Sequence, residues 1–174
     1  MTTALMIDIE GLATGPDATI LTIAAQSFDP LGSGWYDREY YARITLESQE
    51  NRAIEDATVE WWSTQGAAKD EAFAEHNRIP LDQALDELYK LAWQHDLIYA
   101  NGPTYDMNIL EHAYKSYGKP LPWRYYKVRD ARTVYGLWPD LPRPPTEHHA
   151  LLDCRRQIEL LQQVHKHLKI TSLK

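Results

Sequence analysis

Three stretches near the start of the chain show the apolar patterns of β-strands. Residues Ala4 to Ile9 and Thr19 to Phe28 are rich in apolar side chains, and the turn-forming sequence GLATGPD separates them, which predicts a hairpin. From Trp35 to Thr45, apolar and polar positions alternate, as expected of a third strand with one buried face. Three consecutive strands of this kind predict an antiparallel meander.

The later part of the chain alternates helices with short strands. Apolar residues from Val59 to Trp62 and from Leu81 to Ala92 have helical spacing, and Pro80 suits a helix start. The further elements expected are a strand over Leu97–Asn101, a helix over Asp106–Tyr117 closed by Gly118, an extended piece around Tyr125–Arg129, and a last helix from about His148 to Leu168. This order predicts an α/β fold with a mixed central sheet, antiparallel strands first and parallel strands later, flanked by helices.

Composition narrows the class of protein. The chain has 174 residues, of which 44% are hydrophobic, and it shows no internal repeat or linker, so we expect one domain over residues 1–174. No apolar run reaches membrane-spanning length, and no signal peptide pattern opens the chain. Cys154 is the only cysteine, which excludes an intrachain disulfide and a thiolate-rich zinc site. We therefore expect a cytoplasmic protein that does not bind membranes.

The formal net charge is −7, which argues against nucleic-acid binding by bulk electrostatics. A polyanionic substrate would have to be bound by local features.

Four acids stand where strands end or helices begin. Asp8 and Glu10 are two residues apart on a predicted strand and therefore point to the same side. Asp106 follows the strand at Leu97–Asn101, and Asp153 lies in the last helix. Taken singly, each has an ordinary explanation, because strand-end acids are often solvated, Asp106 could cap a helix, and Asp153 could be a surface acid.

If the four carboxylates converge at one sheet edge, divalent cations must compensate their repulsion. Oxygen ligands point to Mg²⁺ or Mn²⁺. Two such ions about 3.5–4 Å apart can hold a phosphodiester for hydrolysis. A base must take the proton of the attacking water, and His148, five residues before Asp153, is the candidate.

These motifs resemble those of the DnaQ-like 3′–5′ exonucleases of the DEDDh type, which have the ribonuclease H-like fold. The resemblance is carried by DIE (Asp8, Glu10), NGPTYD ending in Asp106, and HHALLD with His148 and Asp153. Within that superfamily, VEWWSTQ, NGPTYDMNIL and LPWRYYKVRDARTVY are similar to the small phage and bacterial exonucleases grouped with ribonuclease T-like 3′ exoribonucleases.

The resemblance implies a role for each motif residue. The four acids would be ligands of two divalent cations, Mg²⁺ or Mn²⁺, with Asp8 bridging both, and His148 would be the general base. The family spacing H-x-x-x-x-D selects His148 over the neighbouring His149. The implied reaction is 3′–5′ hydrolysis of single-stranded RNA or DNA to nucleoside 5′-monophosphates, and the related enzymes are frequently homodimers.

Substrate contacts are predicted around these motifs. By the resemblance, Gly11 and Leu12 would line the pocket of the terminal nucleotide, and Tyr105 stands where related enzymes have a phenylalanine. Trp61, next to Trp62, could stack on a base or pack in the core, and Asn108 could touch a sugar or serve turn chemistry. Arg129 belongs to a basic, aromatic stretch, Arg124 to Arg132, which could contact phosphates or be a solvated strand edge.

Two other functions remain as alternatives. A catalytically idle nucleic-acid-binding module could keep the fold, although binding alone needs no cluster of four acids. A ribonuclease H-like endonuclease would use similar acids but cut internally.

Overall fold

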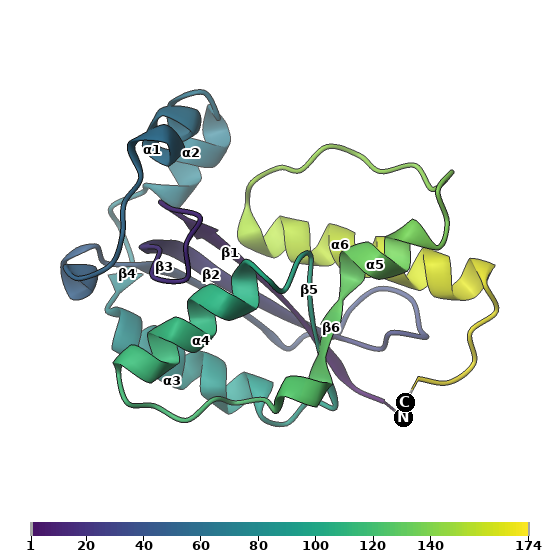
Figure 1. Ribbon diagram of the computed structural model, residues 1–174. Coiled ribbons are helices and arrows are strands. Elements are labelled where there is room, and N and C mark those ends of the chain that lie inside the picture. The colour runs from purple at the N-terminus through teal and green to yellow at the C-terminus, as the bar shows by residue number, and fades with distance from the viewer. Residues whose placement is uncertain (1, 174) are drawn as a thin grey trace.

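A six-stranded mixed sheet runs through the centre of the protein (Figure 1). The computed structural model describes residues 2–173, in which the strands lie in the order β4-β3-β2-β1-β5-β6. β1, β2 and β3 form an antiparallel meander, and β4, β5 and β6 are each parallel to their neighbours. The predicted mixed sheet is confirmed. The strand bounds are Ala4–Gly11 (β1), Ile20–Phe28 (β2), Glu39–Ile44 (β3), Arg78–Ile79 (β4), Leu97–Ala100 (β5) and Val128–Asp130 (β6).

Some elements differ from the sequence-based expectations. β3 begins at Glu39 rather than Trp35, and the two-residue strand β4 is too short to produce a recognisable pattern. The piece expected to be extended from Tyr125 starts as a 3-10 turn, η2 (Tyr125–Lys127), because the Lys127 amide bonds back to the carbonyl of Arg124 at 2.9 Å. Only after this turn does the chain enter β6.

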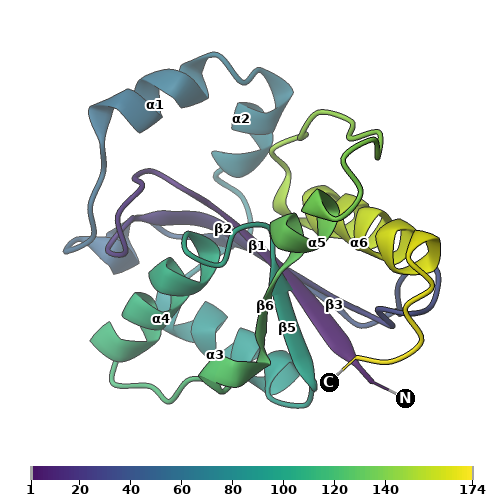
Figure 2. The same ribbon diagram turned by 45° about the vertical axis from the view of Figure 1, so that its right-hand side comes forward.

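Helices cover both faces of the sheet (Figure 2). α3 (Leu81–Ala92) and α4 (Asp106–Ser116) pack on one face, and α5 (Ala131–Gly136) and α6 (Ala150–His167) pack on the other. α1 (Asp56–Ser63) and α2 (Ala67–Ala72) lie together at one end of the sheet, following the 3-10 turn η1 (Glu47–Gln49). No helix within residues 2–173 is long and apolar enough to cross a membrane.

Alternation along β1 decides which way its acids point. Leu5, Ile7 and Ile9 pack in the core beneath α3 and α4, whereas Ala4 and Met6 pack in the core beneath α5 and α6. Asp8 and Glu10 continue the second series, so both carboxylates lie on the side of α6.

β5 ends earlier than β1 and leaves room for a loop. The last β1–β5 pair joins Ile7 to Ala100, after which the chain turns through Gly102, with a φ of 117°, to start α4. Beyond this point the Ile9 amide has lost its strand neighbour on that side and donates to Asp106 Oδ1 at 3.2 Å. The carboxylate that begins α4 is thereby tied to the end of β1.

The last helix starts two residues later than expected. His148 has a φ of 54°, in the left-handed region, so it lies outside α6, and His149 is the N-cap residue. Further along, Cys154 is fully buried against the sheet, with Sγ 3.6 Å from the carbonyl oxygen of Met6.

Candidate active site

The four predicted acids and the predicted base line one cavity of about 240 Å³. The acids come from three elements, since Asp8 and Glu10 lie on β1, Asp106 is the first residue of α4, and Asp153 lies in the first turn of α6. Asp106 and Asp153 are buried, with exposed fractions of 4% and 3%. Residues up to 145 positions apart in the chain therefore meet at the end of β1, as the sequence predicted.

Part of this cluster has the spacing of a cation site. The ligand atoms of Glu10, His148 and Asp153 all lie within 4.8 Å of one another. Two carboxylates and an imidazole at this separation can surround a divalent cation.

Burial raises the pKa of three of these acids, and repulsion adds to the effect for Asp8 and Glu10. Burial, followed by the charges of Asp106 and Glu10, raises the pKa of Asp8 well above its ordinary range. Burial, and then the charges of Asp153 and Asp106, raise the pKa of Glu10 to about 8. Burial also raises the pKa of Asp106 to about 7, although the Ile9 amide and Arg132 act in the opposite direction. Without a cation, the cluster therefore resists full ionisation.

Gln157 orients the first of the acids. Its side chain is buried on α6, one turn after Asp153, and its Nε2 donates to Asp8 Oδ1 at 2.8 Å. Its Oε1 has no hydrogen-bond partner among the described residues, and Gln157 is one of the residues that line the cavity.

Asp153 is held by two groups of its own. The Glu147 amide donates to Asp153 Oδ1 at 3.1 Å, and Arg156 Nη2 lies 2.8 Å from the same oxygen. Arg156 also donates to the carbonyl of Pro145. The loop that carries His148 is thus fastened to the helix that carries Asp153.

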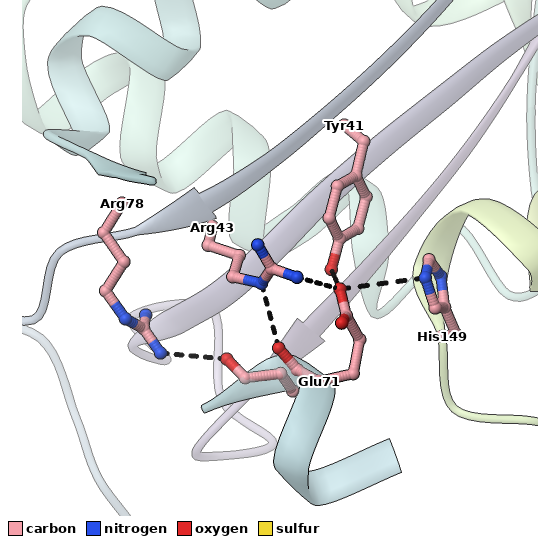
Figure 3. A network of polar contacts seen from close by, with 6 residues as sticks. Tyr41, Arg43, Glu71, Arg78 and His149 are labelled. Atoms are coloured by element: carbon pink, nitrogen blue, oxygen red, sulfur yellow. Dashed lines mark hydrogen bonds and ion pairs between the residues drawn. The ribbon is translucent and has the colours of Figure 1, made fainter. Parts of the chain in front are cut away.

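The two adjacent histidines have different surroundings. His148 lines the cavity, with Nε2 3.2 Å from Thr146 Oγ1 and its ring 4.8 Å from that of Trp61. His149 stacks on Tyr41 and faces Glu71 (Figure 3), and it is not among the residues that line the cavity. The geometry agrees with the choice of His148 as the candidate base.

A second cavity adjoins the first and shares Glu10, Tyr105 and His148 with it. Gly11 and Trp61 line this second cavity as well. Trp61 is 40% exposed, whereas Trp62 is buried and donates from Nε1 to the carbonyl of Gly11 at 3.0 Å. Trp61 therefore forms part of the cavity wall, whereas Trp62 packs in the core.

Three residues predicted to bind substrate line neither of these two cavities. Leu12 is buried with Leu21 and Trp62 in a small core. Asn108 is exposed and donates to the carbonyl of Thr104, and Arg129 Nη1 donates to the carbonyls of Tyr126 and Val128. Their contact with substrate stays a prediction.

Arg132 and Gln157 also line the cavity, and of the two only Arg132 lies in a stretch for which a phosphate contact was considered, whereas no role was predicted for Gln157. Arg132 belongs to the basic stretch around Arg129, and its side chain passes over Gly102. Gln157 follows Asp153 by four residues, so helical periodicity places both on one face of α6. The four-residue spacing from Asp153 could therefore have indicated that Gln157 lies at the site.

Comparison with protein families identifies the chain. A family model described as the 3′–5′ exoribonuclease Rv2179c-like domain matches residues 3–165. The chain belongs to this Rv2179c-like family. The description of this family agrees with the predicted reaction class, that of a 3′–5′ exonuclease.

Solved structures show the same fold at low sequence identity. Escherichia coli exonuclease I in a zinc-bound complex with single-stranded DNA has a TM-score of 0.74 and 16% identity, covering 97% of this chain and 42% of that chain. A complex of the same nuclease with a dT13 oligonucleotide has a TM-score of 0.70 and 15% identity, covering 97% and 43%. Cell-death related nuclease 4 has a TM-score of 0.63 and 13% identity, covering 96% and 64%.

This chain therefore spans less than half the length of the exonuclease I chains that it matches. Comparison with curated protein sequences gives no match. The likeness to these solved structures agrees with the predicted fold class, a mixed sheet flanked by helices.

Proposed function

We propose that this Rv2179c-like protein removes nucleotides from the 3′ end of single-stranded RNA by metal-assisted hydrolysis. The observation that carries the proposal is the cavity in which Asp8, Glu10, Asp106 and Asp153 meet His148. The charges of Asp106 and Asp153, from two helices, raise the pKa of Asp8 and Glu10 on β1, and such a cluster is costly for the fold alone but suits a site that binds cations.

The donor set fits two divalent cations of the Mg²⁺ or Mn²⁺ type. The four carboxylates supply oxygen ligands, and Asp8 has the central place because Glu10, Asp106 and Asp153 all act on its pKa. When bound, such ions would make water a better nucleophile and stabilise the leaving oxygen.

His148 is proposed as the general base. Its imidazole lines the cavity beside Glu10 and Asp153, where it can accept the proton of the water that attacks phosphorus. The bond to the 3′ oxygen of the preceding nucleotide then breaks, and that oxygen takes a proton from solvent. The products are a nucleoside 5′-monophosphate and a chain one nucleotide shorter with a free 3′ hydroxyl.

The adjoining cavity has the lining expected of a site for the terminal nucleotide. Trp61 and Tyr105 offer aromatic surface for a base, and Gly11 lets the nucleotide approach the backbone. Arg132, at the wall of the acidic cavity, can neutralise a phosphate. The nucleic-acid partner is thus a free single-stranded 3′ end.

RNA is proposed because the family is described as exoribonucleolytic. DNA is the second candidate, because the exonuclease I neighbours were solved with single-stranded DNA. A homodimer and a cytoplasmic location also stay proposals, the latter resting on the single cysteine.

The experiment incubates the protein with matched 5′-labelled single-stranded RNA and DNA in Mg²⁺, Mn²⁺ or EDTA and resolves the products by length. We expect a metal-dependent ladder that shortens from the 3′ end, with RNA degraded faster. Faster degradation of DNA would move the substrate assignment to the second candidate.

Two controls separate the rival functions. Circular single-stranded RNA has no 3′ end, so its cleavage would indicate an endonuclease. Asp8→Asn keeps an oxygen that can accept from Gln157 but removes the charge, and it should abolish activity while the protein stays folded. Binding of RNA without degradation by the unaltered protein would indicate the idle module.

A further inference from the structure

His148 and His149 are neighbours in the chain, yet their rings are held by different partners. His148 has a φ of 54°, a left-handed conformation that residues with a side chain seldom adopt. Such a conformation persists only when its surroundings fix it. The contacts of the neighbouring residue, His149, therefore bear on what fixes it.

His149 has two contacts outside its own segment, one with the sheet and one with α2 (Figure 3). Its ring stacks on Tyr41, with centroids 5.1 Å apart and an interplanar angle of 27°. Its Nε2 lies 3.8 Å from Glu71 Oε1 on α2. The imidazole is therefore pinned between a β3 side chain and a helix side chain.

Glu71 is itself held by β3. The Tyr41 hydroxyl donates to Glu71 Oε1 at 2.7 Å, and Arg43 Nη2 donates to the same oxygen at 2.5 Å. Arg43 Nε also donates to the backbone carbonyl of Glu71 at 3.0 Å. Because Tyr41 and Arg43 belong to a sheet strand, the Glu71 carboxylate has a fixed position.

The same α1–α2 segment contacts both histidines. Trp61 on α1 meets the His148 ring edge-on at 4.8 Å and 88°, while Glu71 on α2 faces His149. His149 is also the N-cap residue of α6, and its carbonyl accepts from the Asp153 amide at 2.9 Å. Its position thus affects both the candidate base and a candidate metal ligand.

Packing alone does not account for a histidine at this position. His149 Nδ1 is buried and has no hydrogen-bond partner among the described residues, which carries a desolvation cost that phenylalanine would avoid. The other ring nitrogen, Nε2, is the one that faces Glu71, at 3.8 Å.

We propose that His149 is a positioning residue, which with Tyr41 and Glu71 holds His148 in its left-handed conformation and aims the imidazole into the acidic cavity. The role rests on the proposed function only in that His148 is taken as the base.

The test compares His149→Ala, His149→Phe and Glu71→Gln with the unaltered protein. His149→Ala removes both anchors, and we expect kcat to fall about tenfold, less than the roughly 10²–10⁴-fold that a lost general base would cost. The KM for RNA should stay within about twofold, since misplacing a catalytic group affects the chemical step. Glu71→Gln should lower kcat in the same direction by a smaller factor.

Asp70→Asn is the matched control, because it removes one charge from the adjacent, exposed position of α2. Its kcat should be unchanged. His149→Phe fills the same volume and can stack on Tyr41 but cannot contact Glu71 through a nitrogen. It decides the matter if His149→Ala fails to fold, and its kcat should fall between those of the unaltered protein and a His148→Ala variant.

The second readout does not depend on activity. NMR of the metal-free protein follows the His148 imidazole protons, which the ring current of Trp61 shifts at this separation. We expect the resonances to move in the His149 and Glu71 variants and to stay in Asp70→Asn. Unmoved resonances, or a His149 variant as inactive as His148→Ala, would overturn the positioning role. If the unaltered protein degraded no nucleic acid, the proposed function would fail, and the resonances would still test the positioning.

Discussion

Gln157 on the last helix donates a hydrogen bond to Asp8 on the first strand, with Nε2 and Oδ1 2.8 Å apart. The contact joins residues 149 positions apart and fixes one oxygen of a carboxylate that lies among three other acids. Because an amide donor is neutral, it orients the carboxylate and leaves the charge of the acids available to cations.

Replacing Gln157 with leucine should therefore weaken the site without unfolding it. We expect about a 10–100-fold loss in apparent Mg²⁺ affinity or in activity, the usual range for groups that orient a ligand. Metal titrations of RNA cleavage provide the measurement. Gln163→Leu, on the exposed side of the same helix, is the control. Equal metal dependence in both variants would contradict the orienting role.

The raised carboxyl pKa values predict how stability depends on pH. In the metal-free protein, the pKa of Glu10 is about 8 against 4.5 ordinarily, so the folded state binds more protons than the unfolded state between these values. Stability must then fall as pH rises through that window.

Thermal melts in EDTA at pH 5 and pH 8 measure this effect. Relative to Glu10→Gln, the unaltered protein should lose about 4–8 °C between the two pH values, equivalent to about 2 kcal/mol. Mg²⁺ should restore more stability at pH 8 than at pH 5, because cations compete with the bound protons. A metal-free melting temperature that rises in parallel for both proteins would argue against a repulsive cluster.

Arg132 and Arg129 give a paired prediction on substrate binding. Arg132 lines the cavity, whereas Arg129 donates to backbone carbonyls near η2. Arg132→Gln should weaken RNA binding and reduce the slope of log affinity against log salt by about 0.7, as expected for one lost phosphate contact to a single strand. Arg129→Gln should change the slope less. The reverse ranking, measured by RNA titration at several salt concentrations, would restore Arg129 as the phosphate contact.

Gly11 should tolerate no side chain. A Cβ atom at this position would lie 3.0 Å from the Tyr105 hydroxyl and 3.1 Å from the carbonyl of Thr19. Gly11→Ala should displace Tyr105 and raise the KM for RNA about tenfold, as overpacking typically costs about 1–3 kcal/mol. Adding Tyr105→Phe removes the nearer atom and should recover part of the loss. No recovery would place the clash at Thr19 instead.

Much of the fold follows from local pattern. The spacing of hydrophobic residues along the sequence predicts the meander and the helices α3, α4 and α6. The two-residue period of a strand also predicts that Asp8 and Glu10 face the same side. The convergence of the acids could be anticipated because strand ends and helix starts meet at one sheet edge, and the family resemblance gave their order.

What escaped prediction depends on tertiary contacts. β4 pairs through two residues, and the left-handed φ of His148 has no signature in its own sequence neighbourhood. The orientations of Arg129 and Arg132 depend on where η2 ends and α5 begins, which the basic stretch alone does not specify. Long-range partners such as Glu71 and His149 are set by the packing of α2 on β3.

The single thiol of Cys154 can report transient separation of α6 from the sheet. It sits immediately after Asp153 and is fully buried, and burial raises its pKa well above the ordinary range, so it is inert while α6 stays on the sheet. A thiol reagent can reach it only when α6 transiently separates from the sheet. The labelling rate therefore measures how often the local opening occurs that would also separate Asp153 from Asp8 and Glu10. Cations or a nucleotide bound between β1 and α6 should make this opening rarer and slow the labelling of Cys154, a measurement that does not depend on catalysis.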